Sequence, residues 1–199
     1  MANPNAPFGL KAVRNLDGTP IYTEKVSISA NYATALFIGD PVVYTTTSAH
    51  KDTTARYQTV IRSSGATTVL IRGVIFGFAP LPTNLELLHN PASTARIAYI
   101  VPATLNTVFQ IRDDGAGTPA AVWVGSNSVC VTGSGGSTVT GLSSYALDGS
   151  VHTDTQAHSL HILGLAGEPD NELGDYAVWE VQLNTCYNAT GMILGVVAA

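Results

Sequence analysis

The segment that most constrains the fold is residues 160–184, where an apolar run, a turn-rich connector and an alternating run follow one another. In residues 176–184 the apolar side chains recur at every second position, which is typical of a half-buried strand: Ala177, Trp179, Val181 and Leu183. The connector 166–175 contains Gly, Pro, Asp and Asn, which favour turns. These residues predict two strands joined by a polar loop, with Trp179 at the centre of a core between two sheet layers.

Short apolar runs bounded by turn residues recur along the rest of the chain. Strands are predicted within residues 21–28, 33–44 on either side of a turn at Gly39, 57–61, 69–78, 94–101, 108–112, 122–124 and 128–132. A short helix is predicted at 83–89, because Thr83 and Glu86 have capping-box spacing and Asn90 precedes a proline. The tail 191–199 suits a last strand or a docked extension. The expected class is all-β: a jelly-roll-like sandwich or barrel with at most one short helix.

The first 20 residues contain three prolines and two glycines, a density that argues against a packed element. They are predicted to form an extended N-terminal arm. Because Phe8, Leu10 and Val13 would be costly to leave in water, the arm is expected to lie in a groove of its own or of a neighbouring subunit. Residues 21–199 are then expected to be a single β domain with a long surface excursion near 45–68.

The composition indicates a protein whose surface is largely covered by other subunits. Hydrophobic residues make up 45% of the chain and charged residues only 12%, against about 25% charged in an average soluble protein. The net charge is −5 and the nine basic residues are scattered, which argues against nucleic-acid binding. No signal peptide and no long apolar run are expected, so the predicted location is a reducing cytoplasm or a particle assembled there, without a membrane partner. Cys130 and Cys186 suit buried free thiols or a single disulfide.

Two clusters contain residues of the types that bind metal ions. The first is a histidine-rich segment, and in a strand at 158–162 two of its histidines would point to opposite faces: His152, Asp154, His158 and His161. The second is an acidic turn, which lacks the glutamate that an EF-hand loop would require where Val181 stands: Asp170, Asn171, Glu172 and Asp175. Ordinary surface histidines and an acid-rich turn are the favoured interpretations, with weak calcium binding left open. No metal or other cofactor is predicted.

The sequence offers no arrangement that favours catalysis. Residues 115–120 match a GxGxxA pattern, but a predicted strand follows instead of the helix that dinucleotide binding requires. No GxSxG elbow is present, and the adjacent Asp113 and Asp114 precede a glycine, as in a turn. An enzyme is therefore not predicted.

Four segments together carry a family resemblance: residues 7–18, 33–42, 91–96 and 168–179. In these segments the chain resembles a family of tailed-bacteriophage virion proteins that are encoded beside the major capsid protein and are called capsid decoration, stabilisation or cement proteins. The resemblance extends over essentially the whole chain, in order. It implies a β-rich, jelly-roll-like subunit that sits on the outer face of an icosahedral shell at symmetry axes and clamps neighbouring capsid subunits against internal DNA pressure. The family has no catalytic residues.

This resemblance implies the phage major capsid protein as a partner, and a location on the capsid exterior after assembly in the host cytoplasm. Symmetry favours self-association as a dimer or trimer. The arm residues Phe8, Leu10, Val13 and Arg14 are the predicted capsid or subunit contacts. Two alternatives remain: a structural part of the tail or portal vertex, and a host-glycan-binding module. The glycan module would use exposed aromatic side chains: Tyr22, Tyr44, Tyr57 and Tyr145.

Overall fold

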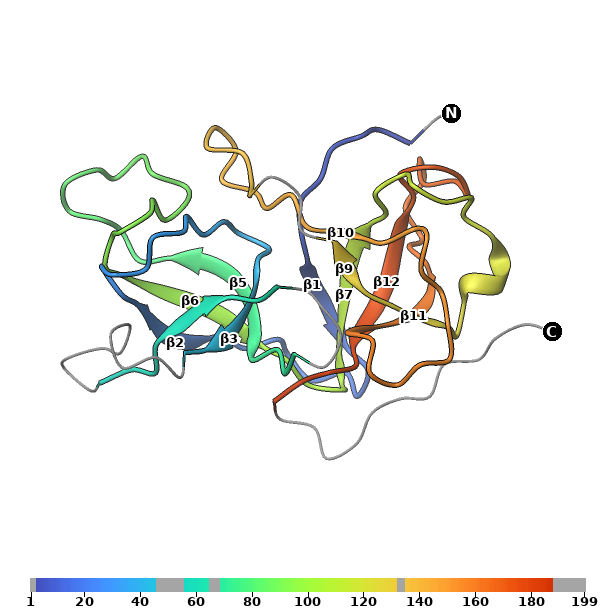
Figure 1. The fold of residues 1–199 in the computed structure, drawn as a ribbon, viewed down its shortest axis with the longest axis horizontal. Coiled ribbons are helices and arrows are strands. Elements are labelled where there is room, and N and C mark those ends of the chain that lie inside the picture. Colours follow the sequence, from blue (N-terminus) through green and yellow to red (C-terminus); the bar gives the residue numbers. More distant parts are fainter. Residues whose placement is uncertain (1–2, 46–55, 65–68, 132–134, 188–199) are drawn as a thin grey trace.

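The computed structural model describes residues 3–45, 56–64, 69–131 and 135–187, and it consists of two five-stranded antiparallel sheets and a two-stranded ribbon (Figure 1). Sheet A contains, in spatial order, β1 (Lys11–Asn15), β7 (Thr107–Arg112), β12 (Val178–Leu183), β11 (Leu160–Leu165) and β8 (Asn127–Ser128). Sheet B contains β2 (Glu24–Ile28), β6 (Arg96–Pro102), β5 (Gly73–Phe78), β3 (Pro41–Tyr44) and β4 (Val60–Arg62). The ribbon pairs β9 (Cys130–Val131) with β10 (Ala146–Leu147).

The all-β prediction is confirmed, and two large antiparallel sheets are consistent with a β-sandwich. The jelly-roll connectivity stays a prediction. Sheet B is formed by consecutive strands, β2 to β6, and is inserted between β1 and β7 of sheet A. Figure 1 shows the two sheets side by side, with β1 and β7 on the side of sheet A that faces sheet B. The two sheets therefore meet along a boundary, and a binding site can form there.

The core of sheet A is organised around Trp179, as the alternating run predicts. Strands β11 and β12 are antiparallel neighbours, with Leu165 opposite Trp179. Trp179 is fully buried, and its ring centroid lies 5.5 Å from that of the buried Trp123. Both cysteines lie in this core as free thiols. An aromatic pair of this size dominates the apolar area buried by the sheet.

Sheet B has its own hydrophobic cluster, and it also contributes to that of sheet A. Because side chains alternate along a strand, Val74 and Ile75 of β5 point to opposite faces. Val74 and Val101 belong to the cluster around Trp179, whereas Ile75 and Ile100 belong to the cluster of sheet B. The first half of β5 and the second half of β6 are therefore buried on both faces, which explains the apolar residues that occupy successive positions there.

Three local predictions are wrong. Residues 33–38 do not form a strand, since the backbone there makes only isolated bridges, from Leu36 to Asn90 and from Ile38 to Leu142. Residues 83–89 form turns instead of a helix, because the Asn84 side chain accepts a hydrogen bond from the backbone N–H of Glu86 (3.1 Å) and closes an Asx-type turn. The predicted strand 122–124 is a 3₁₀ turn, η2 (Ala121–Trp123), in which only Trp123 is buried. The tail 191–199 and most of the excursion at 45–68 lie outside the described residues.

The extended arm is also corrected, because residues 11–15 form β1 and pair with β7. Leu10 is 2% exposed and belongs to the core. The segment before β1 is held at two points. The backbone N–H of Leu10 donates to the carbonyl of Gly39 (2.9 Å), and the side chain of Asn3 donates to the carbonyls of Glu172 (2.8 Å) and Asp175 (3.0 Å). The prolines and glycines thus shape a strand entry that is packed on the chain's own surface.

Candidate contact surface

A groove with a volume of about 510 Å³ runs between the two sheets. Its lining is apolar apart from Lys11, Gln110 and Glu168. One side is formed by the N-terminal segment and β1, with Phe8, Leu10 and Ala12. The other is formed by sheet B with its loops and by the loop before β10, which contribute Ile38, Val74, Ile75, Phe76 and Val101, and Leu142, respectively. A groove that is apolar and open to solvent is suited to an extended apolar segment of another protein.

Phe76 is the most unusual residue of this groove, because 62% of its surface is exposed. The register between β5 and β6 shifts between Ile75 and Gly77, so Phe76 occupies a β-bulge. A bulge re-aims the side chain of its extra residue, and here it turns a large aromatic ring away from both clusters. A Cβ atom at Gly77 would meet no described atom within 4 Å, so the chain leaves open space beside Phe76.

Two loops extend the apolar surface beyond the groove. The loop between β5 and β6 exposes Leu85 (75%) and Leu88 (49%), and the loop before β10 exposes Val139 (83%). The loops touch each other, since a Cβ atom on Gly141 would lie 2.5 Å from the Cβ of Leu88. In Figure 1 both loops and the N-terminal segment lie along the upper edge of the molecule. We call Phe76, Leu85, Leu88 and Val139, together with the groove, the apolar surface.

A buried polar contact holds the floor of the groove. The carboxylate of Asp40 is fully buried and accepts hydrogen bonds from the Ser143 hydroxyl (2.6 Å) and the Phe37 N–H (2.9 Å). Burial raises the pKa of Asp40 to about 6, against the lowering effect of these hydrogen bonds and of Arg62. The contact joins the turn before β3 to the segment before β10, and the N–H of Ile38 donates to Gly141 nearby (2.8 Å).

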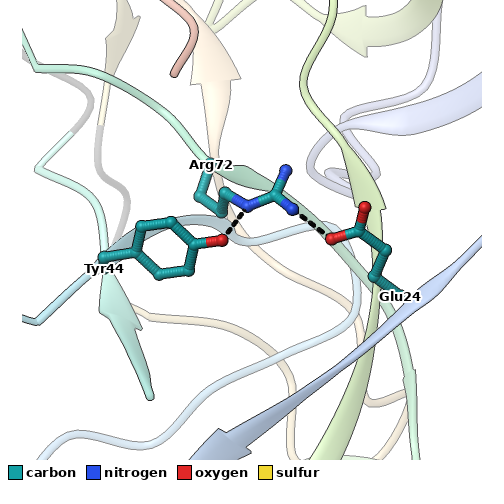
Figure 2. A network of polar contacts seen from close by, with 3 residues as sticks. All are labelled: Glu24, Tyr44 and Arg72. Carbon is teal, nitrogen blue, oxygen red and sulfur yellow. Dashed lines mark hydrogen bonds and ion pairs between the residues drawn. The ribbon is translucent and has the colours of Figure 1, made fainter. Parts of the chain in front are cut away.

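A second polar network ties the strands of sheet B together on the side near the end of β12. The Arg72 guanidinium lies between the Glu24 carboxylate and the Tyr44 hydroxyl and donates to both (Figure 2). The ring of Tyr44 meets that of Tyr187 edge to face at 5.1 Å. Arg72 is buried and forms an ion pair with Glu24, although its Nη1 has no hydrogen-bond partner, so this network mainly supports the sheet.

The four predicted contact residues have separate locations. Phe8 and Leu10 both line the groove, but Leu10 is buried in the core and presents little surface to a partner. Val13 lies at a register shift in β1, and Arg14 forms an ion pair with Glu180 (2.6 Å). Of the four, Phe8 therefore remains with the apolar surface. Sequence patterns did not reveal Phe76, because a bulge leaves no mark in a continuous apolar run.

The two groups of possible metal ligands are not assembled into a site. His152 stacks on Trp123 (5.3 Å), while Nδ1 of His161 is 2.7 Å from the side-chain oxygen of Asn127. The Asn171 amide closes its own loop by donating to the carbonyls of Ala166 and Val178. Within the described ranges, no three His, Cys, Asp or Glu residues are grouped in a way that could hold a metal ion.

The tyrosines proposed for glycan binding do not form a common surface. Tyr145 is 1% exposed, so the expectation that it is exposed is wrong, and Tyr44 belongs to the Arg72 network. Tyr22 and Tyr57 are exposed at 56% and 36%.

No family model matches the chain, and no curated protein or solved structure shows significant similarity to it. In the described part of the chain, no helix has the length and hydrophobicity needed to cross a membrane.

Proposed function

We propose that the protein is a structural virion component that decorates the outside of a tailed-phage capsid and cements neighbouring capsid subunits through the apolar surface. The observation that carries this proposal is Phe76, a large ring that a β-bulge holds 62% exposed beside an apolar groove. The family resemblance of the sequence and its low charge support the same role. An extended apolar segment of the major capsid protein is the proposed occupant of the groove.

Mass action would supply the stabilisation. A subunit that binds only the assembled, expanded shell stabilises it in proportion to the logarithm of its occupancy, and many copies add their effects. Self-association as a dimer or trimer at a symmetry axis would present several apolar surfaces at once. A cement needs no catalytic group, so the proposed role is not enzymatic.

The test is binding of the purified protein to expanded shells of the cognate phage that lack it. Burial of Phe76 should contribute about 2 kcal/mol, so Phe76→Ser should weaken attachment by about 30-fold in co-sedimentation. Leu16→Ser is the matched control, since Leu16 is 52% exposed but lies outside the apolar surface, and it should attach like the wild type. Wild-type attachment by the triple variant Phe76→Ser, Leu85→Ser, Val139→Ser would contradict the proposal.

Copy number in purified particles separates a cement from the tail or portal-vertex alternative. A shell cement is present in numbers comparable with the major capsid protein, whereas a vertex or tail component is present in far fewer copies. Quantitative gel densitometry of whole phage measures this ratio directly. A low ratio, or absence from the particles, would overturn the decoration role.

A further inference from the structure

Arg112 is a buried cation that forms no ion pair with the residues that the structure describes. It is the last residue of β7 and is only 6% exposed. Its Nε and Nη1 atoms are buried and have no hydrogen-bond partner. Burial lowers the pKa of Arg112, against the raising effect of Asp113 and other neighbours. A buried guanidinium with unpaired nitrogens is costly, and this points to an acceptor that the described residues do not supply.

Arg112, whose Nε and Nη1 atoms are unpaired, lines a cavity of about 240 Å³. One wall is the N-terminal segment, with Asn3, Pro4, Ala6 and Phe8, and the other is the loop before β12 and the start of that strand, with Glu168, Asp170, Asn171, Tyr176 and Val178. Phe8 separates this cavity from the groove between the sheets, which it also lines. The hydrogen bonds from Asn3 to Glu172 and Asp175 hold the two walls together.

Tyr176, whose aromatic ring lies against the Arg112 guanidinium, is held in a strained backbone conformation. The centre of the guanidinium lies 4.9 Å from the centroid of the Tyr176 ring, and Tyr176 has a left-handed backbone with φ of 64°. Its N–H donates to Asp113 (2.9 Å), and a side chain at Gly115 would collide with its ring. Strained residues that surrounding contacts hold in place are concentrated at binding sites.

Asp113 forms no ion pair with Arg112, although its charge acts on the guanidinium. One of its oxygens accepts the N–H groups of Gly115 (2.7 Å) and Tyr176, and neighbouring side chains of a strand point to opposite faces. The exposed Glu168 and Asp170 stand at the cavity but form no ion pair with the guanidinium. The charges of Glu168 and Asp170 would repel an anion that carries several negative charges. Four other lining residues are apolar and suit a short aliphatic chain: Pro4, Ala6, Phe8 and Val178.

We propose that this cavity is a binding site for a single carboxylate borne on a short apolar chain. A carboxylate matches the planar fork formed by Nε and an Nη of arginine, and because Nε and Nη1 are covered in this structure, the ligand would pair with them by displacing part of the N-terminal wall of the cavity. The ligand is either a free short-chain acid or the terminal carboxylate of another protein chain. The site is independent of the proposed capsid contact.

The test is a titration of ¹⁵N-labelled protein with sodium butyrate, followed through the arginine Nε–Hε and backbone signals. A saturable shift of the Arg112 signal with a dissociation constant on the order of millimolar is expected, without effect of the neutral butyramide and with weaker binding of inorganic phosphate. Arg112→Gln, or Arg112→Met if the first variant folds poorly, should weaken binding at least tenfold. Arg14→Gln, a change of the exposed arginine on β1, should leave binding unchanged.

Two peptides distinguish the sources of the carboxylate. A short peptide that ends in apolar residues and a free carboxylate, compared with its amidated form, should bind more tightly than butyrate if the natural ligand is a protein chain end, and no better if it is a free acid. Either result supports the site. Equal butyrate affinity in Arg112→Gln overturns it. Absence of a saturable shift both in the wild type and in Glu168→Gln, which removes a competing carboxylate, also overturns it.

Discussion

The carboxylate of Asp40 accepts a 2.6 Å hydrogen bond from the hydroxyl of Ser143, although 103 positions separate the two residues in the sequence. Both residues are fully buried. The bond joins the turn that enters β3 of sheet B to the segment that enters β10, directly behind Ile38 and Leu142 of the groove. The floor of the groove therefore depends on one buried acid.

This acid predicts a dependence of stability on pH. Because the pKa of Asp40 in the folded protein is about 6, above its ordinary value of 3.8, the folded state holds the proton more tightly than the unfolded chain. The resulting stabilisation is complete below about pH 4 and is lost as the pH rises through about 6. Urea unfolding should show a loss of about 3 kcal/mol over this window that is specific to Asp40.

Asp40→Asn is the variant that isolates this effect, because its side chain keeps the shape and stays neutral. The difference in unfolding free energy between Asp40→Asn and the wild type should grow by about 3 kcal/mol from pH 4 to pH 7.5 in favour of the variant. Asp154→Asn, at an exposed carboxylate, serves as the control for loss of one acid. A constant difference across the range would show that Asp40 titrates normally.

The N-terminal segment passes close to Gly39, so a single methyl group added at Gly39 is expected to destabilise the protein strongly. Gly39 has φ of 92°, and a Cβ atom there would lie 2.4 Å from the carbonyl oxygen of Phe8. Gly18 has a similar φ of 75° but faces open space, so it separates backbone strain from collision. Gly18→Ala should cost about 1 kcal/mol, and Gly39→Ala clearly more, measured by denaturant unfolding. Equal costs would mean that the two segments are not in contact.

The tryptophan pair predicts which core substitution is most damaging. Trp179 is fully buried at 5.5 Å from Trp123, so Trp179→Ala should destabilise the protein by about 3 to 5 kcal/mol. Val122→Ala, beside the pair in sequence but 49% exposed, should change stability by less than about 0.5 kcal/mol. Thermal unfolding followed by circular dichroism measures both. A mild effect of Trp179→Ala would place the main core elsewhere.

Both cysteines should be unreactive in the native protein. Burial raises the pKa of the Cys130 thiol to about 12 and that of Cys186 to about 11, and both side chains are almost fully covered. Since the thiolate is the reactive species, a thiol reagent should label neither residue at pH 8 on the time scale of minutes and both after denaturation. Rapid labelling of one cysteine in the native protein would show that the residues that cover it move apart. Absence of labelling after denaturation would indicate a disulfide.

The strands that were predicted correctly are those in which burial alone determines the spacing of apolar residues. The alternation around Trp179 located β12, and the apolar run at 69–78 located β5, because a half-buried strand and a fully buried strand impose different patterns. The error at 83–89 arose because Thr83 and Glu86 imitate a capping box, while Asn84 stabilises a turn over the same residues. Local signals could not decide between these competing hydrogen bonds.

The sites were beyond prediction for a different reason. The exposure of Phe76 results from a register shift between two strands, and the isolation of Arg112 results from coverage by residues 3–8 and the loop before β12. Both features depend on how segments that are far apart in the sequence pack together. The spacing of apolar residues along the chain carries no information about that packing. The same holds for β1, because the prolines and glycines that flank it concealed that Lys11–Asn15 pairs with β7 at the edge of sheet A.

The attachment of the first described residues to the last loop of sheet A affects how the chain is made. Asn3 binds carbonyls at positions 172 and 175, and β1 pairs with a strand that begins at Thr107. A ribosome synthesises these partners long after the N-terminal segment has left the exit tunnel. Sheet B can be completed during translation, whereas sheet A must wait, so the nascent chain carries an unpaired strand through most of its synthesis and needs protection from aggregation during that time.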